Sequence, residues 1–165
     1  MMESLTEILR RLHDAKVEFT LIGGLAARHY GVTLVTEDVD ICARFTPENL
    51  RRIENAFKDF HPRHRLTAHK MPFELTDELC GRLKNIYLTT DLGILDCLSE
   101  VAGVGDFEAV LRQSEAREFP FGCCYIIKMD ALIQAKQAAG RPHDLMAVAQ
   151  LQAIKGKDEQ QKNSL

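Results

Sequence analysis

The stretch LIGGLAARHYGVTLVTEDVDICARF, residues 21–45, decides how the rest of the sequence is interpreted. An apolar segment runs into Gly23-Gly24, and further on Asp38 and Asp40 flank a valine in a segment with the composition of a buried strand. Side chains alternate between the faces of a strand, so both acids project from one face, roughly 6–7 Å apart along the backbone. Two such carboxylates repel one another unless a cation, a base or water compensates. The pair therefore indicates either an acidic turn or a metal site.

A third acid completes the pattern of a metal site. Asp96 lies inside GILDCL, 93–98, an apolar run in which an unpartnered carboxylate would be costly to bury. Carboxylate oxygens suit Mg²⁺, which completes its shell with water and substrate phosphate, and three acids can hold two ions. Asp91 also borders a strand-like run and is the rival for the third position. The residues alone leave both acids open for this position.

The glycine pair allows two interpretations. Gly23-Gly24 falls between a strand-like run and the start of a helical segment, where backbone amides can approach a phosphate closely. The same dipeptide is also typical of an ordinary tight turn. The order of glycine pair, paired acids and third acid favours a phosphate site.

Length and composition indicate one globular domain. The chain has 165 residues, of which 45% are hydrophobic and 27% charged, and residues 1–155 are expected to form a single domain. Residues 156–165 are polar and predict a flexible tail. No apolar run approaches the roughly 20 residues needed to cross a bilayer, and the N-terminus has no apolar signal core. A cytoplasmic protein without a membrane partner is expected.

Charge and metal-binding residue types exclude several other classes. The formal net charge of −3 gives no global footprint for nucleic acid, although Arg63, His64, Arg65 and Lys70 form either a solvated basic loop or a local site for an acidic partner. The five cysteines are odd in number and contain no CxxC pair, so neither a disulfide framework nor a zinc site is predicted. His61, His64 and His69 have no spacing that places them on one face.

Hydrophobic periodicity predicts an α+β (α/β) fold, a small mixed sheet flanked by helices with a helical C-terminal part. Segment 61–84 is expected to be irregular, and 85–98 is read either as two strands or as one strand with a bulge. The expected helices are 3–14, 25–30, 47–60, 106–111, 130–139 and 143–154, and the expected strands are 17–22, 38–43, 85–90, 93–98 and 123–127.

The glycine pair, the sequence TEDVDI and the later strand acid together resemble the nucleotidyltransferase superfamily, which includes DNA polymerase beta and the bacterial aminoglycoside nucleotidyltransferases. The stretch LIQAKQAAGRPHDLMAVAQL, 132–151, is similar to the helical end of small toxin-type bacterial members. The resemblance spans roughly residues 15–151. Relatives often carry a basic residue two positions before Thr36, where this chain has Leu34, and this departure concerns the choice of substrate.

The resemblance implies a role for each matching residue. Gly23 and Gly24 would bind phosphate, and Thr36 precedes the acids as in many relatives. Asp38, Asp40 and Asp96 would be the catalytic acids and would ligate two Mg²⁺ ions, with Asp96 drawing the proton from the attacking hydroxyl. Asp96 is preferred to Asp91 because GILDCL is the better match to the family's pattern of an acid within an apolar strand. Lys136 would approach the nucleotide phosphates or hold the acids, and Arg141 with Asp144 would fix the junction of the last helices. The alternative for these three is an exposed helix face with an ordinary ion pair.

The implied reaction moves a nucleoside monophosphate from a nucleoside triphosphate such as ATP to an acceptor hydroxyl, with release of pyrophosphate. A small molecule, a tRNA end and a protein hydroxyl are all consistent acceptors. The rival interpretations are a catalytically silent nucleotide-binding module and an interaction protein of a toxin–antitoxin pair. A second subunit or a partner protein is expected to complete the cleft of so short a chain.

Overall fold

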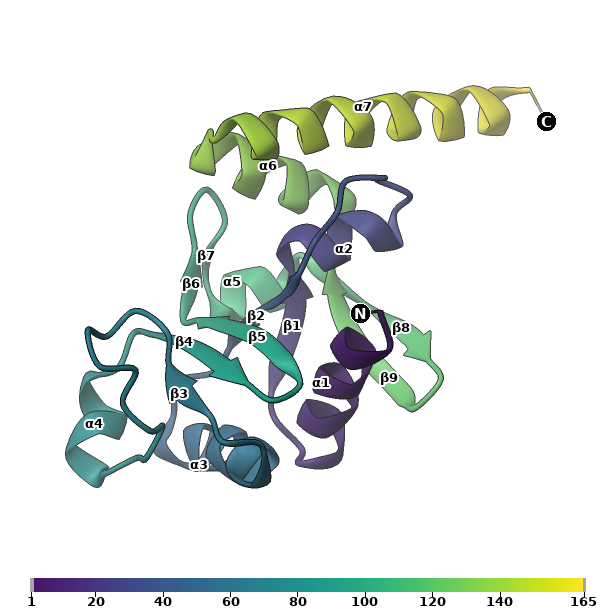
Figure 1. Ribbon diagram of the computed structural model, residues 1–165. Helices are drawn as coiled ribbons and strands as arrows, with labels where there is room; N and C mark the ends of the chain where they lie inside the picture. Colours follow the sequence, from purple (N-terminus) through teal and green to yellow (C-terminus); the bar gives the residue numbers. More distant parts are fainter. Residues whose placement is uncertain (1, 165) are drawn as a thin grey trace.

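A seven-stranded mixed sheet lies at the centre of the molecule in the computed structural model, which describes residues 2–164 (Figure 1). The sheet has the order β3-β4-β5-β2-β1-β9-β8, and β6 and β7 form a separate hairpin. The strands are β1 (Phe19–Ile22), β2 (Asp38–Ala43), β3 (Arg63–His64), β4 (Asn85–Thr90), β5 (Gly93–Leu98), β6 (Glu100–Val101), β7 (Gly105–Asp106), β8 (Ser114–Phe119) and β9 (Gly122–Ile127). The helices are α1 (Met2–Asp14), α2 (Gly23–His29), α3 (Pro47–Phe57), η1 (Lys58–Phe60, 3₁₀), α4 (Asp77–Arg82), α5 (Phe107–Arg112), α6 (Met129–Ala139) and α7 (Pro142–Asn163).

The register of the central strands places the acids in one row. Strand β2 runs antiparallel to β1 and parallel to β5, so that Asp40 lies opposite Ile22 on one side and Asp96 on the other. Asp96 in turn lies opposite Tyr87 of the antiparallel strand β4. Because directly paired residues project from the same face, the row from β1 to β4 presents both acids on one side of the sheet.

The alternate residues of the same strands build the core. Val39, Ile41, Leu95 and Cys97 are all fully buried. Helix α1 buries its stripe of Leu5, Ile8, Leu9 and Leu12 and packs against α3 and the sheet. The predicted alternation of β2 is therefore confirmed, with an apolar face toward the core and an acidic face away from it.

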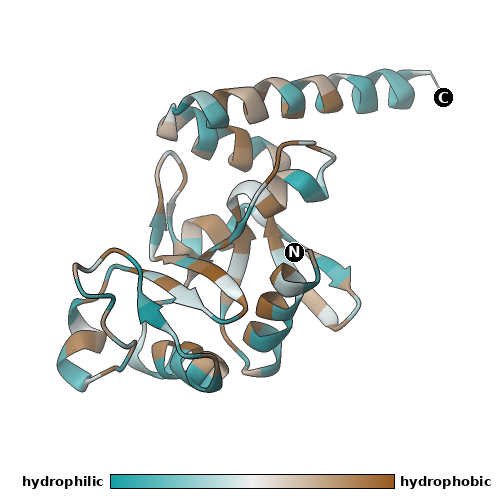
Figure 2. Cartoon of the chain, in the orientation of Figure 1, coloured by the Kyte–Doolittle hydropathy of each residue, from teal (hydrophilic) through white to brown (hydrophobic). Residues whose placement is uncertain are grey.

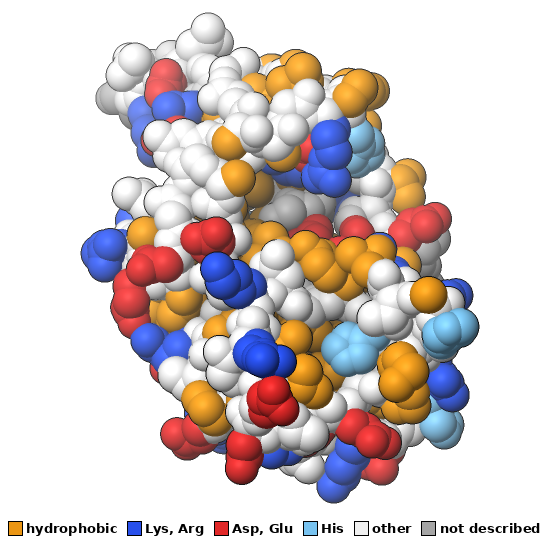
Figure 3. Space-filling model, turned by 90° about the vertical axis from the view of Figure 1, so that its left-hand side faces the viewer, with side chains coloured by type: hydrophobic (Ala, Val, Ile, Leu, Met, Phe, Trp, Pro, Cys, Tyr) orange, Lys and Arg blue, Asp and Glu red, His pale blue; other side chains and the backbone are white. Residues whose placement is uncertain are grey.

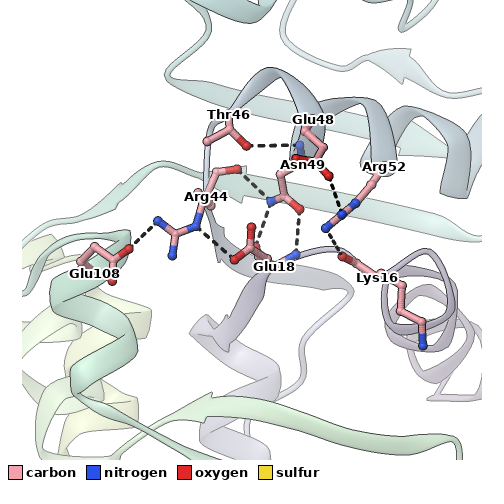
Figure 4. Close-up of polar contacts among 8 residues, drawn as sticks. All are labelled: Lys16, Glu18, Arg44, Thr46, Glu48, Asn49, Arg52 and Glu108. Carbon is pink, nitrogen blue, oxygen red and sulfur yellow. Dashed lines mark hydrogen bonds and ion pairs between the residues drawn. The ribbon is translucent and has the colours of Figure 1, made fainter.

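A buried asparagine fastens α3 to two strands (Figure 4). The side-chain oxygen of Asn49 accepts a hydrogen bond from the Glu18 backbone N–H at 2.8 Å. Its amide nitrogen donates to the carbonyl oxygens of Glu18 at 3.0 Å and Arg44 at 2.8 Å. Thr46, the N-cap of α3, accepts from the Asn49 N–H at 3.3 Å. These bonds fix the chain entering β1 to the chain leaving β2.

Several predicted boundaries are wrong. Gly23 and Gly24 are not a turn before a helix but the first two residues of α2. The segment 61–84, expected to be irregular, contains β3 and α4. Of the two alternatives for 85–98, the structure has the two strands, paired as a hairpin, and this prediction is confirmed. Strand β8 was not predicted, because this edge strand is mostly polar and exposed.

The end of the last helix also differs from the prediction. Helix α7 does not end near Ile154 but continues to Asn163. Its last turns project beyond the rest of the molecule and carry hydrophilic residues on all sides (Figure 2). Lys, Glu and Gln are good helix formers, so the segment extends an existing helix without needing an apolar face to pack. No helix among residues 2–164 has the length and apolar character required to cross a membrane.

The Asn49 contacts predict a stability effect. Asn49→Ala leaves the backbone groups of Glu18 and Arg44 without their partners in a buried site, so the free energy of unfolding should fall by about 2–3 kcal/mol. Thr46→Ala, which removes only the helix cap, should cost about 1 kcal/mol. Urea denaturation followed by circular dichroism measures both values. Equal losses for the two variants would contradict the role of Asn49.

Candidate active site

Three carboxylates meet at the end of the central strands. Asp38 and Asp40 of β2 and Asp96 of β5 each place an oxygen within 4.8 Å of the others. They line a cavity of about 680 Å³ that also contacts Gly23 and Gly24 on one side and Lys136 of α6 on the other. Figure 3 shows this hollow, with acidic side chains at its floor and a basic side chain on its upper rim. Asp96 is therefore the acid that joins the pair.

Asp91 lies outside this cluster. It follows β4 at the hairpin turn, is exposed, and pairs with His61 Nδ1 at 2.6 Å. The three histidines of segment 61–69 do not form a metal cluster with other described residues. All five cysteines are free.

The glycine pair is required by the acids themselves. A Cβ on Gly23 would lie 2.2 Å from Asp40 Oδ2, and the backbone of Gly23 has a φ of +66°. A Cβ on Gly24 would lie 2.6 Å from Thr36 Oγ1. The Gly24 backbone also donates a hydrogen bond to Asp40. Only glycine allows the β2 acid and the threonine to approach the first turn of α2 this closely.

Thr36 orients the first acid. Its hydroxyl donates to Asp38 Oδ1 at 3.0 Å. Because the same hydroxyl packs against Gly24, the threonine links the glycine pair to the Asp38 carboxylate. The structure thus places Thr36 beside both features that the sequence singled out.

A buried ion pair forms the opposite wall of the cavity. Lys136 Nζ lies 3.4 Å from Asp144 Oδ1, and both side chains are buried. Arg141 Nε donates to Asp144 Oδ2 at 2.6 Å. Burial alone would raise the pKa of Asp144, but Arg141 and Lys136 together hold it below its usual value. Lys136 is therefore not on an exposed helix face, and its contact with Asp144 joins α6 to α7. Arg141, the N-cap of α7, pairs with Asp144 within the first turn of that helix.

The charge of the acids is incompletely compensated in the protein alone. Burial, followed by the negative charges of Asp38 and Asp96, raises the pKa of Asp40 to about 7. Burial also raises the pKa of Asp96, against the opposing effect of Arg65. The cluster thus has a deficit of positive charge, which a bound divalent cation would relieve.

Comparison with known proteins identifies the architecture. No protein-family model and no curated protein sequence matches the chain. Among solved structures, the lincosamide antibiotic adenylyltransferase LnuA, bound to lincomycin, is similar at a TM-score of 0.64 and 14% identity, covering 93% of this chain and 98% of that one. TM1012 of Thermotoga maritima, a provisionally assigned nucleotidyltransferase, is similar at 0.58 and 19% identity, covering 90% of each chain. ANT(2'')-Ia, in complex with adenylyl-2''-tobramycin, is similar at 0.53 and 14% identity, covering 98% of this chain and 99% of that one.

The chain has the nucleotidyltransferase fold. The similar regions extend over nearly the whole length of each protein, so the resemblance includes the helical C-terminal part as well as the sheet. The predicted fold class, a mixed sheet flanked by helices and followed by a helical part, is confirmed.

Sequence reasoning missed one charged contact in this nucleotidyltransferase fold. Arg65 Nη2 donates to both oxygens of Asp96, at 2.6 and 2.5 Å. Arg65 belongs to the basic loop that was expected to be either solvated or a site for an acidic partner. Its position follows from the pairing of β3 with β4, which the sequence of an apparently irregular segment did not reveal. His143 and Glu37 also line the cavity and were not predicted.

The pKa of Asp40 predicts how stability depends on pH without metal. An aspartate raised to about 7 in the folded protein binds a proton between pH 4 and 7 that the unfolded chain has released, so native stability falls as pH rises through this window. In EDTA at pH 8, Asp40→Asn should melt roughly 5 °C above the native protein, and the difference should disappear near pH 4.

Thermal denaturation at both pH values measures this difference. Glu37→Gln, which removes an exposed acid from the same cavity, serves as the control and should shift the midpoint far less. An Asp40→Asn variant less stable than the native protein at pH 8 would show that Asp40 is not under electrostatic strain.

Proposed function

We propose that the protein is a Mg²⁺-dependent nucleotidyltransferase that moves a nucleoside monophosphate from a nucleoside triphosphate to an acceptor hydroxyl and releases pyrophosphate. The observation that carries the proposal is the convergence of Asp38, Asp40 and Asp96 at the floor of a cavity whose opposite sides are the glycine pair and a buried lysine. The fold of LnuA and ANT(2'')-Ia supports it, because both are described with adenylyl transfer or an adenylylated product.

The acids fit a magnesium site. Three carboxylates supply hard oxygen donors within 4.8 Å of one another, and burial together with the charges of Asp38 and Asp96 raises the pKa of Asp40. Asp38 and Asp40 would hold the ions, with Asp96 completing the set. When bound, two Mg²⁺ ions neutralise phosphate charge and increase the acidity of the acceptor hydroxyl.

The surrounding residues would position the triphosphate. Gly23 and Gly24 have no side chains to keep a phosphate from their backbone, and Thr36 holds Asp38 in place beside them. Lys136 lies on the opposite wall, where its positive charge faces the same space and acts on Asp40. A triphosphate between these walls would have its reacting phosphorus near the three acids, as in-line transfer requires.

Asp96 would act on the acceptor. It is the acid on β5, at the side of the cluster away from the glycine pair, so an acceptor hydroxyl entering beside β5 would meet its carboxylate. There Asp96 would take the hydroxyl proton as the oxygen attacks.

The acceptor is proposed only by class. LnuA and ANT(2'')-Ia are described with lincomycin and with adenylyl-2''-tobramycin, both small molecules. A small-molecule hydroxyl is therefore the first acceptor to test, followed by a protein hydroxyl and a tRNA end. ATP is the first donor to test, and the cytoplasmic location and a second subunit or partner protein also stay predictions.

The central prediction concerns nucleotide binding and turnover. The native protein should bind a nucleoside triphosphate only with Mg²⁺, as measured by calorimetric titration with each of the four nucleotides. Asp38→Ala and Asp40→Ala should abolish this metal-dependent binding. Asp96→Asn should retain binding and lose roughly a thousandfold in turnover, measured as transfer of labelled nucleotide, because the proton acceptor is removed.

Asp91→Asn is the matched control, since it removes the exposed acid that the sequence offered as an alternative. It should bind and turn over as the native protein does. Turnover retained in Asp40→Ala would reject the catalytic assignment. Triphosphate binding without any transfer would favour a silent nucleotide-binding module, and no binding would favour an interaction protein.

A further inference from the structure

Asp96 is paired with a positively charged side chain of the protein itself, that of Arg65. A single nitrogen of Arg65, Nη2, donates to both carboxylate oxygens of Asp96, at 2.6 and 2.5 Å. Asp96 is largely buried, whereas Arg65 is only partly covered. The guanidinium thus contacts the same two oxygens that a metal ion chelated by Asp96 would use.

A backbone hydrogen bond fixes the main chain of Arg65 but not the position of its guanidinium group. The Arg65 N–H donates to the Tyr87 carbonyl oxygen at 2.8 Å, which holds the residue beside β4. From there the side chain crosses Tyr87, with its guanidinium carbon 5.7 Å from the ring centroid, and reaches Asp96 on the next strand. Rotation of the side chain alone would break the contact, because the backbone bond does not depend on it.

The hydrogen bonding of the Arg65 guanidinium is also incomplete. Within residues 2–164, the buried Nε of Arg65 has no hydrogen-bond partner. A buried unsatisfied donor costs free energy, and the side chain would recover it by turning toward water. Arginine cannot lose its charge at any ordinary pH, so Arg65 can leave Asp96 to a metal ion only by moving.

We propose that Arg65 is a positioning residue that holds Asp96 in the metal-free protein and is displaced from it when a divalent cation binds. The proposal rests on the function proposed above, since it assumes that the three acids bind metal. In the absence of metal, Arg65 compensates part of the charge of the cluster and keeps Asp96 in the row with Asp40. Metal binding is correspondingly weakened, because the ion has to compete with the guanidinium.

The opposite role predicts the opposite result. If Arg65 remained on Asp96 and helped it to hold the metal, then removing Arg65 would weaken metal binding. If Arg65 only supported the fold, its removal would lower stability and leave metal affinity unchanged. The direction of the change in metal affinity therefore separates the three roles.

The test measures binding of Mn²⁺ alone, without nucleotide, at pH 8 by electron paramagnetic resonance of the free ion. Arg65→Gln should bind Mn²⁺ about tenfold more tightly than the native protein, because a competing positive charge has been removed. Arg65→Lys keeps that charge and should stay closer to the native affinity. Arg63→Gln, a change to an exposed arginine two residues earlier, should alter the affinity by no more than about twofold.

Each outcome has a separate meaning. Unchanged or weaker Mn²⁺ binding in Arg65→Gln, with native binding that is lost in Asp40→Ala, overturns the role of Arg65 and leaves the metal site standing. No Mn²⁺ binding to the native protein, or binding that persists in Asp40→Ala, overturns the metal site and the role of Arg65 together.

A second measurement follows the native protein and uses the conservative variant Arg65→Lys only to assign the resonance. The ¹⁵N side-chain resonance of Arg65, assigned by comparison with Arg65→Lys, should show a guanidinium with restricted rotation in EDTA. Saturating Mg²⁺ with a non-hydrolysable triphosphate should release it to free rotation. A resonance that stays restricted while metal and triphosphate bind would overturn the proposal.

Discussion

The mutual repulsion of three carboxylates at one end of the sheet is the constraint on which the rest of the site depends. The register of β2 with β5 brings Asp40 and Asp96 side by side, and Asp38 lies two residues away on the same face. Three neighbouring groups compensate part of this negative charge. Gly24 donates a backbone hydrogen bond to Asp40, Thr36 donates one to Asp38, and Arg65 binds Asp96. The pKa of Asp40 still rises, so the protein alone does not fully compensate the cluster.

This constraint also gives the glycine pair a second purpose. A glycine pair after a strand is readily explained by a phosphate that must approach the backbone. Here the carboxylate of Asp40 and the hydroxyl of Thr36 occupy the space that side chains on Gly23 and Gly24 would need. The same two residues thus allow the acids to reach the start of α2 and themselves line the cavity.

Local patterns in the sequence were sufficient for the sheet's central strands and for the three acids. The alternation of DVDICA predicted that Val39 and Ile41 are buried opposite the acids, although Cys42, on the face of the acids, is buried as well. The match of GILDCL to the family pattern favoured Asp96 over Asp91, and Asp96 is the acid that lies beside the pair. The features that could not be predicted are a contact that depends on strand pairing between distant segments and a helix end that does not pack against the rest of the protein. Arg65 reaches Asp96 only because β3 pairs with the edge of β4. Helix α7 continues past Ile154 although its sequence there has no apolar stripe from which a helix could be predicted.

The most direct test of the proposed site is a crystal structure with Mn²⁺ and a non-hydrolysable nucleoside triphosphate. Anomalous scattering locates the metal independently of any assumption about the site. We expect Mn²⁺ to be held by Asp38 and Asp40, with the triphosphate bound in the same cavity beside Gly23-Gly24. A triphosphate bound elsewhere, or a cluster of acids that stays free of metal in the presence of bound nucleotide, would contradict it.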